Sequence, residues 1–199
     1  MTADLRRSPL AHRAGELAAV GSRSAGAVRI EELPFRSLLN LRLDPAGPAV
    51  SSAGDVLGVD LPLAPNTWAG TGDLAVLWLG PDEWLVVGPP GAEEELEPQL
   101  RAAAGDADVS VVVVSAHRTV LTVSGAAALD LLARGCALDL HPRVFPPGRC
   151  AQTMLARAQV VLVARPAGEL WVLVRSSFAD YLASWLLDAA VEYTSVPAS

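Results

Sequence analysis

The spacing of apolar and polar positions predicts short strands that alternate with short helices. The stretch SLLNLRL at 37–43 is typical of a strand, and apolar periodicity over 50–57 indicates a short helix. In AVLWLGPDEWLVVG, two apolar, β-branched and aromatic stretches flank the residues GPDE at 80–83. Proline fixes φ, and glycine and aspartate tolerate turn geometry, so a β-hairpin is predicted there.

The same order of elements continues through the rest of the chain. Acidic residues at 93–97 predict the first turn of a helix, because negative charge is favourable near a helix N-terminus, and VSVVVV at 109–114 predicts a buried strand. RTVLTVS then predicts a strand, GAAALDLLARGC a helix that ends at Gly135, AQTMLARAQVVLVAR extended chain, and ELWVLVRS its hairpin partner. Apolar residues at spacings of three and four predict a last helix within SFADYLASWLLDAAVEY.

These elements suggest an internal repeat. Leu41 aligns with Leu121, 80 residues later, and Trp84 then matches Trp171 in the second hairpin. Each copy alone would leave one sheet face uncovered, so two copies around one core would bury the many Val and Leu side chains. The expected fold class is therefore α+β, with two repeated β-α-β-β-α units and antiparallel sheets.

The expected organisation is an N-terminal arm, one domain and a short tail. Residues 1–34 mix Arg, Gly and Ser without a long amphipathic period, so we expect an arm that is ordered by contact. The domain would span 35–192, with pseudo-repeats at about 35–115 and 116–192. Residues 193–199 would form the tail.

Composition narrows the possible partners. The chain has 199 residues, 51% of them hydrophobic, and a formal net charge of −7, which argues against nucleic acid or an anionic membrane as a ligand. All 15 basic residues are arginine, so chemistry that requires lysine is excluded. The longest purely apolar stretches, such as 75–79, are far shorter than the ~20 residues of a membrane span. Charged residues interrupt the apolar residues of the N-terminal segment, so it lacks the continuous apolar region of a signal peptide. The chain is therefore expected in the cytoplasm.

The sequence offers no convincing cofactor, metal or catalytic site. GTGDLA at 70–75 resembles a dinucleotide fingerprint but precedes a strand instead of following one. Cys136, His141 and Cys150 lack a close Cys-x-x-Cys pair, so both cysteines are expected as buried thiols. His117 beside Arg118 has no G-x-S-x-G nucleophile to serve, so this polar pair is expected to anchor a strand end or to face a partner.

Several blocks in the correct order carry a family resemblance. LGPDEWLVVG, SAHRTVLTVSGAAALDLLARGCALDLHPRVFPPGRCAQTMLARAQVVLV and RSSFADYLASWLLDA resemble the gamma subunit of heterotetrameric sarcosine oxidase over most of 35–192, and RSPLA at 7–11 resembles the opening segment of that family. Arg118 to Leu132 is also similar to the folate-binding domain of aminomethyltransferases, which implies that fold. Those enzymes carry an Asp between the strands after this helix, where this chain has MLARAQVVLV without a carboxylate, so independent aminomethyl transfer is not expected.

The resemblance implies a non-catalytic subunit of an assembly that oxidises sarcosine to glycine, transfers the one-carbon unit to tetrahydrofolate and produces hydrogen peroxide. FAD, FMN, NAD and tetrahydrofolate would be bound by the alpha, beta and delta partner subunits and none by this chain alone. This chain would complete interfaces and help to shield a reactive imine from water. The interface candidates are Arg7, Pro9, Leu10, His117 and Arg118.

Two alternatives remain open at this stage. A stand-alone folate-binding protein related to aminomethyltransferases would need a carboxylate for the pterin, and Asp139 and Glu169 are the nearby candidates. A structural scaffold in another oxidoreductase would bind no folate and would associate with different partners.

Overall fold

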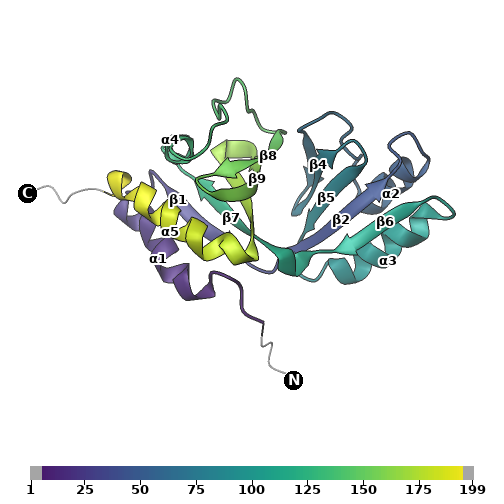
Figure 1. Cartoon of the computed structure of the whole chain (residues 1–199), viewed down its shortest axis with the longest axis horizontal. Helices are drawn as coiled ribbons and strands as arrows, with labels where there is room; N and C mark the ends of the chain where they lie inside the picture. The colour runs from purple at the N-terminus through teal and green to yellow at the C-terminus, as the bar shows by residue number, and fades with distance from the viewer. Residues whose placement is uncertain (1–5, 195–199) are drawn as a thin grey trace, which may run out of the picture.

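The computed structural model describes residues 6–194, which form two five-stranded antiparallel sheets (Figure 1). The order in the first sheet is β1 (Arg29–Leu33), β7 (Arg118–Ser124), β10 (Leu170–Arg175), β9 (Ala158–Ala164) and β8 (Cys150–Leu155). The order in the second sheet is β3 (Trp68–Thr71), β4 (Leu74–Gly80), β5 (Glu83–Gly88), β2 (Ser37–Leu43) and β6 (Val109–Val113). The expected hairpin is β4–β5, with its turn at 81–82.

Helices cover the outer face of each sheet. Figure 1 shows α1 (Ala14–Arg23) and α5 (Ala179–Ala190) next to each other over the first sheet, with the short α4 (Ala128–Ala133) at its end. The second sheet carries α2 (Ala49–Leu57) and α3 (Glu93–Ala104). Five short 3-10 helices complete the described chain: η1 (Ala11–Arg13), η2 (Ser115–His117), η3 (Pro166–Gly168), η4 (Ser176–Phe178) and η5 (Val191–Tyr193). This arrangement confirms the expected α+β class with antiparallel sheets.

Three apolar clusters hold these layers together. One lies between the first sheet and its helices, one between the second sheet and its helices, and the third between the two sheets. Alternate residues of a strand point to opposite faces, so Leu38 packs between the sheets while Leu39 packs under the helices. Because many strands are buried on both faces, they appear in the sequence as continuous apolar stretches.

The two repeats exchange their first strands. β1 begins at residue 29 and β6 at residue 109, and each immediately precedes its own repeat. Nevertheless β1 pairs with β7 of the second repeat, and β6 pairs with β2 of the first. The two sheet orders then match strand for strand, with β1 and β6 in equivalent edge positions. Each unit is β-α-β-β-β-α after its exchanged strand, one strand more than expected.

The N-terminal segment differs from the arm expected over 1–34. Within its described part, α1 buries Leu17 and Val20, and β1 is an integral strand of the first sheet. The apolar face of α1 is too narrow to give a long periodic pattern, and β1 carries two glutamates, so neither element was recognisable alone. Residues 1–5, and 195–199 of the expected tail, lie outside the described residues.

Two further elements differ from expectation. The loop expected before β4 contains the short strand β3. The sequence of β3 has no clear strand pattern, and its extended conformation comes from pairing with β4. The helix expected over 125–136 is only α4, because Gly125 adopts φ +107° in the turn after β7, which a helical residue cannot do. The extended stretch 151–165 folds back at 156–157 to form the β8–β9 hairpin.

Candidate functional site

A cavity of about 530 Å³ lies where the chain crosses between the two sheets. The crossovers are the link between β1 and β2 and the link between β6 and β7, which contains η2. Figure 1 shows both sheets diverging from this junction. The N-terminal segment before α1 closes one side. The lining residues are Arg6, Arg7, Ser8, Pro9, Phe35, Glu93, Ser115, Ala116, Arg118, Thr119 and Ser176.

Hydrogen bonds fix the walls of this crossover cavity. Glu32 of β1 accepts one bond from the Ser8 hydroxyl at 2.6 Å and another from the Thr119 hydroxyl at 2.6 Å. The backbone N–H of Leu38 donates to Ser115 Oγ at 3.0 Å, which ties the start of β2 to the crossover between β6 and β7. The N-terminal segment and the start of β7 are thereby held by one carboxylate.

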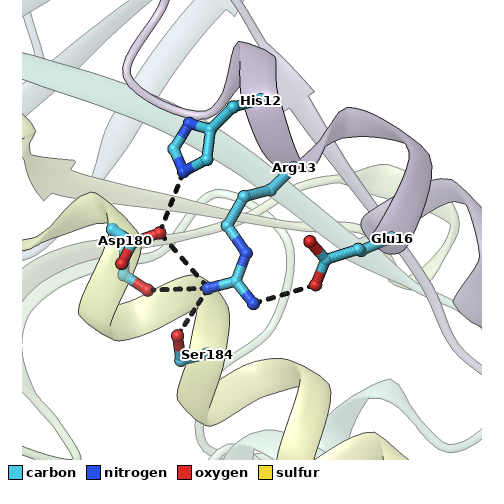
Figure 2. Close-up of polar contacts among 5 residues, drawn as sticks. All are labelled: His12, Arg13, Glu16, Asp180 and Ser184. Carbon is cyan, nitrogen blue, oxygen red and sulfur yellow. Dashed lines mark hydrogen bonds and ion pairs between the residues drawn. The ribbon is translucent and has the colours of Figure 1, made fainter.

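The N-terminal segment is anchored a second time on α5 (Figure 2). The Arg13 guanidinium donates to Asp180 and Ser184 of α5 and also pairs with Glu16 at 3.0 Å. His12 Nε2 lies 3.2 Å from Asp180 Oδ1. Hydrogen bonds to Glu16 raise the pKa of Arg13. Residues near the chain start are therefore joined to the last helix.

Phe35 is the most unusual residue of the cavity. Its φ of +58° lies in the left-handed region, which costs an L-residue roughly 1–2 kcal/mol. The residue is nevertheless 38% exposed, and the Arg6 guanidinium lies 5.2 Å from its ring centroid. A bulky residue held in a strained conformation with its apolar ring in solvent is characteristic of a contact site.

Positive charge collects at the β7 end of the cavity. Arg118 lies directly opposite Arg175 of β10 in the antiparallel register. Burial lowers the pKa of Arg118, and the neighbouring Arg175 lowers it further, while Glu83 acts in the opposite direction. Like charges directly opposite one another destabilise a sheet, so an acidic group from outside would relieve this pair.

The structure brings together three of the five predicted interface residues. Arg7, Pro9 and Arg118 line the crossover cavity. His117 is exposed in η2 but does not belong to the lining. Leu10 has no exposed surface and packs in the core of this chain. The prediction that it contacts a partner is therefore wrong. Leu10 belongs to the RSPLA block at 7–11, and a resemblance between sequences does not reveal the direction of a side chain.

Sequence reasoning missed Phe35, Ser115 and Ser176. Phe35 follows Pro34 in a short break between apolar stretches, which is a usable turn signal but does not predict an exposed ring. The two serines are 61 positions apart and meet only because β7 pairs with β10. No local pattern carries that information.

The other sequence candidates form structural contacts. GTG at 70–72 forms the end of β3 and the start of the turn into the antiparallel β4, and it opens no helix. Asp139 accepts a hydrogen bond from the backbone N–H of His141, and Glu169 accepts one from Trp171 Nε1 at 2.9 Å. Both cysteines are free and buried, and among residues 6–194 no three His, Cys, Asp or Glu residues are grouped to bind a metal ion. No helix in this range is long and apolar enough to span a bilayer.

Comparison with known proteins gives a consistent result along the chain. Residues 42–192 match the family model described as sarcosine oxidase, gamma subunit family. The gamma subunit of sarcosine oxidase from Corynebacterium sp. (strain P-1) is 39% identical over 97% of this chain and 94% of its own length. The corresponding protein from Arthrobacter sp. is 40% identical over 96% and 93%.

Solved structures agree with this relationship. A chain of heterotetrameric sarcosine oxidase from Corynebacterium sp. U-96, in complex with pyrrole 2-carboxylate, superposes with a TM-score of 0.88 at 36% identity, covering 98% of this chain and 100% of that one. Aminomethyltransferase T of the glycine cleavage system from Bartonella henselae superposes with a TM-score of 0.69 at 14% identity, over 92% of this chain and 57% of that one. The second likeness concerns the fold and confirms that part of the expectation. This chain belongs to the sarcosine oxidase gamma subunit family.

Proposed function

We propose that this chain is a non-catalytic subunit that docks through its crossover cavity onto the other subunits of a sarcosine-oxidising complex. The observation that carries the proposal is the similarity over 98% of the chain to a chain of heterotetrameric sarcosine oxidase. The crossover cavity is proposed as the docking surface because it combines an exposed aromatic side chain with several arginines.

The chemistry would take place on the partner subunits. The complex would oxidise sarcosine to glycine, with oxygen as the electron acceptor and hydrogen peroxide as a product, and would transfer the one-carbon unit to tetrahydrofolate. FAD, FMN, NAD and tetrahydrofolate would be held by the alpha, beta and delta subunits, in the cytoplasm. The β8–β9 turn at 156–157 carries no carboxylate that could act as a general acid or base. This favours a non-catalytic role for this chain.

The shape and charge of the cavity suit a protein partner. The exposed Phe35 ring offers an apolar anchor of the kind that dominates binding energy at interfaces. The arginines around it favour a partner surface with acidic residues, which steers association and fixes its orientation. Covering this surface would also exclude water from the junction, as a reactive imine on a neighbouring subunit requires.

A stand-alone folate-binding protein is the second candidate from the sequence, and the positions of its two carboxylates weigh against it. Asp139 is engaged by the backbone of its own loop, and Glu169 by the indole of Trp171. Neither is free to bind a pterin without breaking an internal contact. The aminomethyltransferase likeness, at 14% identity, supports the fold alone.

The decisive experiment is purification of the tagged chain from its own cells, followed by identification of co-eluting proteins, a visible absorption spectrum and an assay for sarcosine-dependent peroxide. Recovery of larger flavin-bearing proteins with that activity would support the proposal. A colourless chain without partners would contradict it.

A separation-of-function variant sharpens this experiment. Phe35→Gly removes the ring and also relieves the left-handed backbone, so the melting temperature of the isolated chain should not fall. Recovery of partner proteins should decrease at least about 10-fold, which corresponds to about 1.4 kcal/mol of binding energy. Leu63→Ala is the control, because Leu63 is 56% exposed but does not line the cavity. Equal recovery with both variants would place the docking surface elsewhere.

A further inference from the structure

One guanidinium is clamped between the two sheets. Arg165, which directly follows β9, lies with its guanidinium carbon 4.4 Å from the ring centroid of Trp68 and 4.2 Å from that of Trp171. Trp68 comes from the second sheet and Trp171 from the first. The charged group is therefore stacked between two indole faces, an arrangement that cation–π attraction stabilises and that restricts its rotamers.

The clamp gives Arg165 no hydrogen-bond acceptor. Its Nε atom is buried without a partner, and none of residues 6–194 forms an ion pair with its guanidinium. The indole faces cannot accept hydrogen bonds in the plane of the guanidinium. Each indole N–H is also engaged elsewhere: Trp68 Nε1 donates to the carbonyl of Ala164 at 2.9 Å, and Trp171 Nε1 donates to Glu169.

Arg36 provides an internal comparison. It stacks on the same Trp171 ring, with its guanidinium carbon 5.6 Å from the centroid. Unlike Arg165, it has a carboxylate partner, because its Nη2 lies 3.4 Å from Asp73 Oδ1. Within residues 6–194, Arg36 is therefore paired with a carboxylate, whereas Arg165, held between two indoles, is not.

An unsatisfied guanidinium in this position has an energetic cost. A buried donor without an acceptor destabilises the folded state, and more so when the group is charged. Burial also lowers the pKa of Arg165, with the charge of Arg36 acting in the same direction and Glu169 against it. The stacked Arg165 guanidinium is already ordered, so it loses little further conformational entropy when its N–H groups bind a matching acceptor.

Space for such an acceptor lies beside the clamp. Arg165 lines an open cavity of about 800 Å³ together with Arg29, Ser124 and Glu169. The Arg29 guanidinium forms no side-chain hydrogen bond or ion pair with residues 6–194, so a second positive charge faces the same space. Glu169 on the wall disfavours a dianion more strongly than a monoanion.

We propose that Arg165 binds a carboxylate supplied by another molecule, in the forked geometry that a guanidinium edge and two carboxylate oxygens share. The singly charged carboxylate is favoured over phosphate because Glu169 and the net charge of −7 repel a dianion more. The carboxylate belongs either to a free small molecule or to an acidic side chain of a partner subunit. The second source rests on the proposed function.

The first arm of the test uses the full chain alone. Sodium acetate is titrated at constant ionic strength against sodium chloride, while the Nε–H resonance of Arg165 and tryptophan fluorescence are recorded. A saturable response that is specific to acetate, lost in Arg165→Met and kept in Arg36→Met, supports a free carboxylate as the ligand. Arg165→Lys keeps the charge but loses the fork, so it should respond at least about 10-fold more weakly.

The second arm measures binding to the co-purified partner subunits. If acetate gives no response, Arg165→Met but not Arg36→Met should raise the dissociation constant at least about 10-fold, which identifies a partner side chain as the source. Circular dichroism and melting curves confirm that each variant is folded. Absence of both responses overturns the inference. Normal assembly of Arg165→Met would leave the proposed docking function intact, so the two failures are distinguishable.

Discussion

Glu32 of β1 accepts a hydrogen bond from the hydroxyl of Ser8, 24 positions earlier in the chain, at 2.6 Å. The same carboxylate accepts from Thr119 of β7. Because β1 is the exchanged strand of the first sheet, this one side chain joins the N-terminal segment, the edge strand and the second repeat beside the crossover cavity.

Loss of that carboxylate should release the N-terminal segment. Glu32→Ala removes two hydrogen bonds to a charged acceptor and should cost about 2 kcal/mol of unfolding free energy. Trypsin should then cleave after Arg7 faster than in the wild type, as mass spectrometry of a digestion time course will show. Glu31→Ala is the matched control, since the exposed Glu31 side chain forms no hydrogen bond with the other residues of 6–194. Equal cleavage rates in the two variants would contradict the anchoring role.

The turn after β7 should tolerate no side chain at Gly125. Its φ is +107°, and a Cβ there would lie 2.4 Å from the carbonyl oxygen of Ala27. Gly125→Ala should therefore lower the unfolding free energy by at least about 2 kcal/mol, measured by urea denaturation. Gly58→Ala should cost only about 1 kcal/mol, because Gly58 has φ +65° but open space around it. A smaller effect at Gly125 than at Gly58 would show that the turn relaxes.

Cys150 should make stability fall in alkaline solution. Burial raises the pKa of its thiol to about 11, while an unfolded cysteine titrates near about 8.5. Above that lower value the unfolded chain loses the proton first, so the free energy of unfolding declines as the pH rises toward about 11. Urea denaturation of Cys150→Ala should show a shallower alkaline decline than the wild type. Identical slopes in the two proteins would refute the assignment.

The thiol should also resist modification. The Sγ of Cys150 lies 3.2 Å from the carbonyl oxygen of Thr67, and both cysteines of the chain are buried. A disulfide reagent at about pH 8 should therefore react with the native chain only as fast as it unfolds. Rapid labelling of one thiol in folded protein would contradict this burial.

The contact between the start of the chain and α5 should depend on salt. Arg13→Met removes the pairs with Asp180 and Glu16, whose exposure limits each to less than about 1 kcal/mol. The loss in unfolding free energy should be larger at low than at high sodium chloride concentration, because exposed pairs are screened. Arg23→Met at the end of α1 is the control, as Arg23 forms no ion pair with residues 6–194. A salt-independent loss would indicate lost packing instead of lost charge.

The sequence determined the elements whose patterns are local. The hairpin around 80–83 follows from turn chemistry between two apolar stretches, and the helix that contains Trp185 follows from apolar spacing. The repeat was visible because Leu41 and Leu121 lie in equivalent strands, and both pack under the helices of their sheets. The match of Trp84 with Trp171 was wrong, since Trp84 packs under helices and Trp171 packs between the sheets. Family membership was also visible, since it rests on ordered blocks of residues.

Tertiary structure decided everything that depends on which distant segments meet. β1 and β3 have weak patterns of their own and are strands only because β7 and β4 pair with them. The exchange of β1 and β6 between repeats places Phe35 and Ser115 on the same cavity, although 80 positions separate them. Leu10 was misplaced for the same reason, because its partners lie in distant elements of the core. Sequence periodicity indicates which face of a single element is buried. A cavity between two crossovers depends instead on which distant strands pair, and no local pattern contains that information.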